Sequence, residues 1–202
     1  MRRRALLALL PALAAAPSAW AQDAGPAAPI ARLDDALLRI MRLGTAHPFA
    51  ERAGVIGPVV QAVYDLPQIL QVSVGPRWGS IPPDQQAKLL EVFTRYTIAS
   101  YVANFDGFDG QRFEIEPHPR AVGADQVVAT RLLARDGDAT RIDYQMRRTA
   151  AGWQVVDVLL DGSISRVAVQ RSDFRSLLAG GGPERLIATL ERKVTTLQSG
   201  NS

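Results

Sequence analysis

The chain contains two histidines and no cysteine, so the residue types that most often bind transition metals are scarce. His47 and His118 each stand directly before a proline, and they are too far apart in sequence to share one helical turn. The acidic pairs within residues 106–109 and 136–138 lack the glutamate-terminated loop that binds calcium, and we expect them to be turn residues. The sequence therefore predicts no metal site and no cofactor.

Serine and glycine motifs for catalysis are also incomplete. Residues 162–165, Gly-Ser-Ile-Ser, lack the second glycine of a nucleophile elbow, and the three glycines at 180–182 lack the lysine of a phosphate-binding loop. A Ser–His–Asp triad with either histidine stays geometrically open, but no local pattern favours it. No catalytic residue is predicted.

Asp157 is the best single candidate for a general base. It lies in a strand-like run, directly between Val156 and Val158. Burying an unpaired carboxylate costs roughly several kcal/mol, so a carboxylate in this setting needs a partner. We therefore expect an arginine or backbone donors to hold Asp157, with acid–base catalysis as the alternative.

The first 21 residues have the pattern of a Sec-type signal peptide. Three arginines at 2–4 precede an apolar run over 5–16, and an Ala-Trp-Ala site at 19–21 predicts cleavage after Ala21. The apolar run is too short to cross a bilayer core of about 30 Å, so a membrane anchor is not expected. The pattern predicts export to the periplasm.

Removal of this signal changes the charge of the chain. The full sequence has 23 basic and 20 acidic residues, and the signal holds three arginines and no acid, which leaves 20 against 20. A neutral mature chain gives no electrostatic motive for binding nucleic acid, and none is predicted. Residues 22–31, rich in Ala, Gly and Pro, are expected to be a flexible lead, and residues 32–202 a single domain and a monomer.

Helical periodicity is clearest between residues 80 and 104, where Pro82 and Pro83 precede Asp84 and where Phe93 and Tyr96 share an apolar face. Gly54 and the Gly-Pro pair at 57–58 predict a kink or a break in an earlier helix. The pattern predicts helices at about residues 30–43, 48–64, 65–72, 80–104, 174–178 and 184–197.

Alternating polarity replaces helical periodicity after residue 110. Turn residues separate the alternating runs, and an Asp-Gly pair at 161–162 predicts a tight turn after the run that contains Asp157. The predicted fold is α+β: a curved antiparallel sheet of about five strands packs against N-terminal and C-terminal helices and encloses an apolar cavity. The strands are expected at about 113–115, 126–134, 140–148, 153–160 and 163–170.

The order of several motifs resembles the periplasmic lipid-binding proteins of the MlaC type, also called the toluene-tolerance or ABC-transporter auxiliary family. The resemblance covers roughly residues 32–197. The polar second helix and residues 72–75 are closer to the branch associated with hopanoid biosynthesis, HpnM. The residues that carry the resemblance are Phe49, Arg52, Pro58, Val63, Tyr64, Asp65, Gly75, Trp78, Asp84, Phe93, Tyr96, Tyr101, Trp153, Val155, Asp157, Val158, Gly162, Ser163 or Ser165, Arg171 and Phe174.

This resemblance implies a lipid carrier whose cargo, a phospholipid or a hopanoid, takes the place of a cofactor. It also implies transient contacts with an inner-membrane ABC transporter complex and an outer-membrane lipoprotein complex. Arg77 and Trp78 are candidates for the pocket rim, although Trp78 could equally cap the core. From alternation and helical spacing, the expected lipid-binding residues are Phe93, Tyr96, Val128, Leu132, Ile142, Tyr144, Met146, Val156, Val158 and Leu160.

Two other classes of function stay open at this stage. An α+β enzyme with a small pocket would use Asp157 as its acid or base, with Tyr144 beside it, and an envelope scaffold would bind no small ligand. The carrier interpretation requires an interior that the chain's own side chains leave under-filled, because each buried methylene of a lipid contributes about 0.8 kcal/mol. A tightly packed interior between the sheet and the long helix would exclude it.

Overall fold

A computed structural model of the chain describes residues 25–200. The predicted signal peptide, with its cleavage site after Ala21, lies outside the described residues. Six α-helices, one short 3-10 helix and six strands make up the described part. In chain order they are α1 (Ala27–Leu43), α2 (Phe49–Val63), α3 (Leu66–Val74), η1 (Gly75–Ser80), α4 (Pro83–Asn104), β1 (Arg112–Ile115), β2 (Arg120–Val122), β3 (Asp125–Leu133), β4 (Ala139–Thr149), β5 (Gly152–Leu160), β6 (Ile164–Ser165), α5 (Arg166–Ala179) and α6 (Gly182–Gln198).

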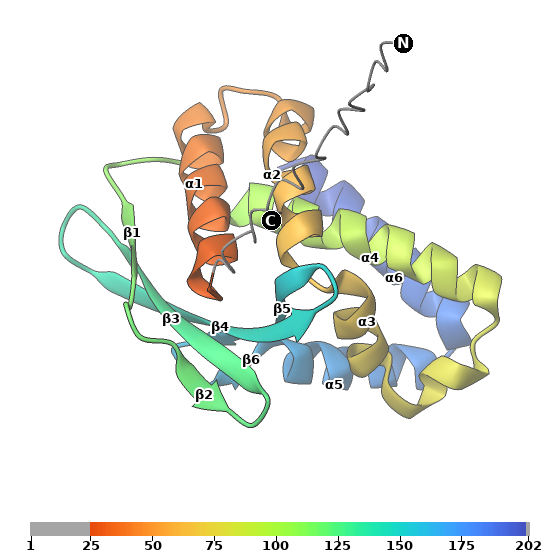
Figure 1. The fold of residues 1–202 in the computed structure, drawn as a ribbon. Helices are drawn as coiled ribbons and strands as arrows, with labels where there is room; N and C mark the ends of the chain where they lie inside the picture. The colour runs from red at the N-terminus through yellow and green to blue at the C-terminus, as the bar shows by residue number, and fades with distance from the viewer. Residues whose placement is uncertain (1–24, 201–202) are drawn as a thin grey trace, which may run out of the picture.

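The strands form one antiparallel sheet in the order β1-β3-β4-β5-β6, and β2 also pairs with β3 at the edge where β1 lies. Figure 1 shows this sheet curving along the lower left, with α1 and α2 above it and α4 and α6 side by side to the right. The fold class predicted from alternation is confirmed, with six strands where about five were expected.

Helix α1 begins earlier than its periodicity predicted. It starts at Ala27, so the second half of the expected flexible lead is helical, and Ile30 is fully buried in the core. Helix α2 runs unbroken through Pro58, although a kink or break was expected there. At Gly57, directly before that proline, an added Cβ would lie 3.4 Å from the Ile98 side chain of α4, so α2 and α4 approach each other closely at this glycine.

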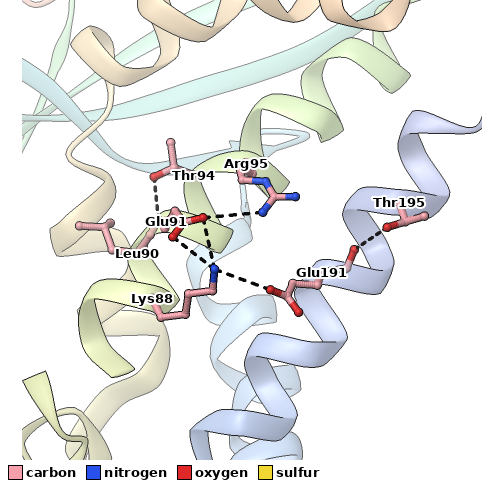
Figure 2. A network of polar contacts seen from close by, with 7 residues as sticks. All are labelled: Lys88, Leu90, Glu91, Thr94, Arg95, Glu191 and Thr195. Carbon is pink, nitrogen blue, oxygen red and sulfur yellow. Dashed lines mark hydrogen bonds and ion pairs between the residues drawn. The ribbon is translucent and has the colours of Figure 1, made fainter. Parts of the chain in front are cut away.

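Helices α4 and α6 lie against each other along their apolar faces. Leu89, Val92 and Phe93 of α4 and Leu186 and Leu190 of α6 are almost fully buried. On the solvent side an exposed ion-pair network joins the two helices (Figure 2). Its members are Lys88, Glu91, Arg95 and Glu191, with Lys88 Nζ 3.3 Å from Glu91 and 3.9 Å from Glu191. Exposed pairs of this kind contribute little, so the buried face holds the helices together.

The segment after β5 differs most from the sequence prediction. Residues 163–170 were expected to be a strand, but only Ile164 and Ser165 pair with β5, and α5 begins at Arg166. The Ser165 hydroxyl accepts a hydrogen bond from the Ala168 amide at 2.9 Å, which makes Ser165 the N-cap. A satisfied helix start at this point overrides the weak alternation, and α5 absorbs the short helix predicted at 174–178.

The turn between β5 and β6 adopts the geometry that its Asp-Gly pair predicts. Asp161 has φ 50° and Gly162 φ 71°, both in the left-handed region. A side chain at Gly162 would also lie 2.9 Å from Arg141 Nε. Arg141 donates two hydrogen bonds, of 2.9 and 2.8 Å, to the fully buried carboxylate of Asp143, so its guanidinium has little freedom to move aside.

We predict that Gly162→Ala lowers the free energy of unfolding by more than the matched change Gly123→Ala. Both glycines have positive φ, but nothing lies within 4 Å of the Cβ position at Gly123. Gly123→Ala should therefore cost only the backbone penalty, about 1–2 kcal/mol, whereas Gly162→Ala should also disturb the Arg141–Asp143 pair. Urea denaturation of both variants measures the difference, and equal losses would contradict it.

Candidate functional site

A cavity of about 340 Å³ opens between the sheet and α4. Its walls come from the linker after α2, from α3, α4, β4 and β5, and from the start of α5. Asn104 and Arg166 are its exposed lining residues and mark its mouth, whereas Phe93 and Tyr144 are almost fully buried. The apolar part of the wall consists of Leu66, Ile69, Phe93, Phe105, Ile142, Val158, Leu160 and Val167.

Six of the ten residues expected to bind lipid lie in the wall of this cavity. Helix α4 supplies two of them, and the neighbouring strands β4 and β5 supply the other four, which face α4 across the cavity. Their contact with a lipid stays a prediction. The six residues are Phe93, Tyr96, Ile142, Tyr144, Val158 and Leu160.

The other four do not line the cavity. Val128 and Met146 are fully buried in the hydrophobic core, and Leu132 lines a second pocket together with Phe105. Val156 is displaced by a β-bulge: Gln145 pairs with Asp157 and Met146 pairs with Val155, so Val156 has no partner across the ladder. Strict alternation grouped Val156 with Val158, but the extra residue puts Val155 into the core cluster instead.

Arg77 and Trp78, the candidates for the rim, also lie elsewhere. Both are in η1, and neither lines the cavity. Arg77 donates a 3.0 Å hydrogen bond to the Leu178 carbonyl near the C-terminus of α5, where a cation is favourable. Trp78 packs against the core and its carbonyl accepts a hydrogen bond from Gln86, as the core-capping alternative for this residue supposes.

All four tyrosines of the chain line the cavity: Tyr64, Tyr96, Tyr101 and Tyr144. The hydroxyls of Tyr64 and Tyr101 are hydrogen-bonded to each other. Sequence reasoning noted Tyr96 and Tyr101 on the long helix but assigned neither Tyr64 nor Tyr101 to the cavity. Tyr64 is the residue that ends α2, and its backbone is extended. It reaches the site because this backbone pairs with Val155 of β5.

Burial keeps the phenols of Tyr64, Tyr101 and Tyr144 neutral. Desolvation raises the pKa of Tyr101 to about 12, although the hydrogen bond from Tyr64 acts in the opposite direction. The pKa values of Tyr64 and Tyr144 are raised well above the usual value, first by burial and then by the charges that would develop on neighbouring groups. At neutral pH the cavity wall therefore presents protonated hydroxyls, which are hydrogen-bond donors as well as acceptors.

Asp34 of α1 is a buried carboxyl group close to these phenols. Both of its oxygens lack a hydrogen-bond partner among residues 25–200, and it is only 5% exposed. Burial, with a smaller contribution from Asp35, raises the pKa of Asp34 from 3.8 to about 7. No sequence pattern singled out Asp34. Helical spacing places it on the apolar face of α1, where a carboxyl group is not expected.

Asp157 lines the cavity but is engaged in local structure. Its Oδ1 accepts hydrogen bonds from the Val158 amide at 2.7 Å and the Val167 amide at 3.1 Å, and its Oδ2 accepts one from the Ser165 hydroxyl. Backbone donors therefore hold this carboxylate, as its buried setting in the sequence led us to expect. The carboxylate satisfies the start of α5 and joins it to β5, and no observation favours the acid–base alternative.

Metal ligands do not gather near the cavity. Within residues 25–200 no three His, Cys, Asp or Glu side chains form a group that could hold an ion. None of the helices in the same range combines the length and the hydropathy that crossing a bilayer requires.

Comparisons with known proteins agree with this fold. A family model described as MlaC protein matches residues 31–192. A search of curated proteins gave no match. A solved structure of a phospholipid-binding protein from Ralstonia solanacearum, determined in complex with a phospholipid, has a similar fold with a TM-score of 0.71. The two sequences are 21% identical, and the match covers 83% of this chain and 95% of that one.

We predict that Asp34→Asn removes a pH-dependent loss of stability. Between pH 4 and 7 the folded chain keeps the Asp34 proton that the unfolded chain releases, so the free energy of unfolding falls as pH rises through this window. A shift from 3.8 to about 7 corresponds to roughly 4 kcal/mol at most. Denaturant unfolding from pH 4 to 8 should give a flatter profile for the variant.

The control for this measurement is Asp35→Asn, which changes the exposed neighbour on the same helix turn. Its profile should follow that of the unmodified protein, because Asp35 contributes only the smaller part of the shift at Asp34. A slope for Asp34→Asn equal to that of the control would contradict the prediction. Tyr64, Tyr101 and Tyr144, the other titratable groups coupled to Asp34, do not ionise in this pH range.

A second prediction concerns the β5–α5 junction. Asp157→Ala should lower the free energy of unfolding by about 2–4 kcal/mol, because the Val158 and Val167 amides and the Ser165 hydroxyl lose their acceptor. Asp157→Asn keeps one acceptor oxygen and should lose less. Thermal and urea unfolding measure both variants, and a loss below about 0.5 kcal/mol for Asp157→Ala would show that the junction does not depend on the carboxylate.

Proposed function

Because the chain belongs to the MlaC family, we propose that it is a periplasmic carrier that holds the apolar part of a lipid, in the first instance a phospholipid, inside the cavity between the sheet and α4. The cavity itself is the observation that carries the proposal. Its walls are mainly apolar, it opens to solvent, and no side chain within residues 25–200 fills it. An interior packed by the chain alone would not support this function.

The energetics of lipid transfer explain why such a cavity is needed. Each methylene taken from a bilayer into water costs about 0.8 kcal/mol, so a sixteen-carbon chain costs about 12 kcal/mol without a replacement environment. The protein has a complementary need. A cavity of about 340 Å³ that stayed dry and empty would cost up to roughly 8 kcal/mol, which is comparable to the whole stability of a domain.

The mouth of the cavity fits the polar end of such a lipid. Arg166 is exposed there at the start of α5, and no residue within 25–200 forms an ion pair with it. An arginine binds phosphate oxygens well because its guanidinium donates in a fixed, planar arrangement. We propose that the lipid tails enter the cavity and that the head group stays near Arg166 and Asn104.

The finer parts of the proposal come from the family resemblance. The mature chain, residues 22–202, would act as a single domain and a monomer in the periplasm after removal of the signal peptide. It would exchange cargo with an inner-membrane ABC transporter complex and an outer-membrane lipoprotein complex. A hopanoid, the cargo suggested by the HpnM-like features, is the second candidate for the ligand.

The test is to identify what co-purifies with the protein and to block the cavity. Mass spectrometry of gently purified protein, after denaturation, should release about one lipid per chain, and the mass of that lipid distinguishes a phospholipid from a hopanoid. Thr97 lines the cavity, so Thr97→Trp should reduce the bound lipid and its extraction from vesicles by at least about tenfold.

Thr94→Trp is the matched control. Thr94 and Thr97 are both half-buried on α4 and bond the carbonyl four residues earlier, at 2.8 and 2.9 Å, but Thr94 does not line the cavity (Figure 2 shows its bond to Leu90). The control should keep its lipid. Absence of any stoichiometric lipid, or equal loss in both variants with intact folding, would overturn the proposal.

A further inference from the structure

The cavity wall holds a hydrogen-bonding group that the protein leaves unused. Tyr144 of β4 is 1% exposed and lines the cavity, and no hydrogen bond joins its hydroxyl to another residue within 25–200. The fully enclosed polar side-chain atoms that lack a partner within residues 25–200 belong to Asp34, Arg52 and Gln85, so the Tyr144 hydroxyl is in contact with the open space of the cavity. Phenylalanine would supply the same apolar surface at this position, but it would offer no hydrogen bond to a molecule in the cavity.

Tyr64 and Tyr101 also have more hydrogen-bonding capacity than they use. Tyr64 and Tyr101 share one hydrogen bond between their hydroxyls, which uses one of their two protons. The second proton and several lone pairs point to no other residue in the described part of the chain. Together with Tyr144, the wall offers two phenolic protons that a hydrocarbon chain cannot accept.

These three hydroxyls belong to one region of the cavity. All three line the same cavity, and the Tyr64 and Tyr101 rings lie 6.0 Å apart. Tyr101 also raises the pKa of Tyr144, and both of them raise the pKa of Tyr64. The buried Asp34, whose oxygens also lack partners, acts on all three phenols. Tyr96 differs from them: it is half-buried, and its ring lies 5.6 Å from Lys193 Nζ on α6.

We propose that Tyr144 and the Tyr64–Tyr101 pair form a polar subsite inside the cavity that donates hydrogen bonds to an acceptor oxygen in the apolar part of the lipid. This inference rests on the proposed carrier function. The oxygen is either the ester carbonyl at the head of an acyl chain or a hydroxyl group on the hydrocarbon body. The subsite makes the carrier selective for oxygen-bearing lipids over pure hydrocarbon of the same size.

Two pairs of probes separate the sources of the oxygen. The first pair is dipalmitoyl phosphatidylglycerol and its dihexadecyl ether analogue, which lacks both carbonyls. The second pair is stearic acid with a mid-chain hydroxyl group and stearic acid itself. Dissociation constants come from displacement of a fluorescent phospholipid. One net hydrogen bond should give about a threefold to tenfold preference for the oxygen-bearing member of a pair.

The expected result is such a preference in at least one pair, lost in Tyr144→Phe, while affinity for the ether lipid or for stearic acid stays unchanged. A preference in the first pair identifies the ester carbonyl, and one in the second identifies a chain hydroxyl. Thr94→Val, which removes a hydroxyl group of α4 that does not line the cavity, should keep the preference. Thermal unfolding checks that both variants fold.

Two results would overturn the inference without affecting the carrier function. The first is binding of all four probes with equal affinity within each pair, and the second is a preference that persists in Tyr144→Phe. Failure of the unmodified protein to bind any probe would instead overturn the proposed function, and the subsite with it.

Discussion

The carboxylate of Asp157 joins the sheet to the helices that close the cavity. It accepts hydrogen bonds from the strand that carries it and from the first turn of α5. Helix α5 then supplies Arg166, Val167 and Gln170 to the cavity wall. Without the Asp157 carboxylate as acceptor, the first turn of α5 would keep an unsatisfied amide. The orientation of α5 relative to β5 would then no longer be fixed at this point.

The cavity imposes a cost that the rest of the molecule must offset. Space between the sheet and α4 forfeits contacts that a packed core would make, and Asp34 adds a buried carboxyl group without a hydrogen-bond partner among residues 25–200. Dense packing elsewhere compensates, as where Leu33, Leu37 and Ile40 of α1 are fully buried. Stability is therefore concentrated away from the site, and the site itself is left incomplete.

The β-bulge opposite Gln145 decides which side chains of β5 face the helices. Before the bulge Val155 enters the core, and after it Val158 and Leu160 line the cavity. A strand without the extra residue would place Val156 with Val158 and Leu160, as alternation predicts. Asp157, the residue directly after the bulge, pairs with Gln145 and also holds the first turn of α5, so the bulge and the junction are adjacent.

The amino-acid sequence by itself determined the local features of this protein. Helical periodicity predicted α4 and α6 closely, alternation predicted β3, β4 and β5 within a residue or two, and the Asp-Gly pair predicted the turn at 161–162. The sequence also indicated the family. No single motif is specific, but the order of several weak motifs along the chain is. These signals are local because propensity, capping and amphipathicity act over a few residues.

Only the tertiary structure decided which residues meet in the cavity. Tyr64 lies far from Tyr144 in the sequence, and its isolated bridge to Val155 places it beside β5, which pairs with the strand β4 that carries Tyr144. The bulge at Val156, the start of α5 at Arg166 and the burial of Asp34 likewise depend on partners from distant elements. Long-range pairing has no sequence period of its own, so the sequence predicted a cavity, but only the assembled sheet and helices decided which side chains and which hydroxyls form its wall.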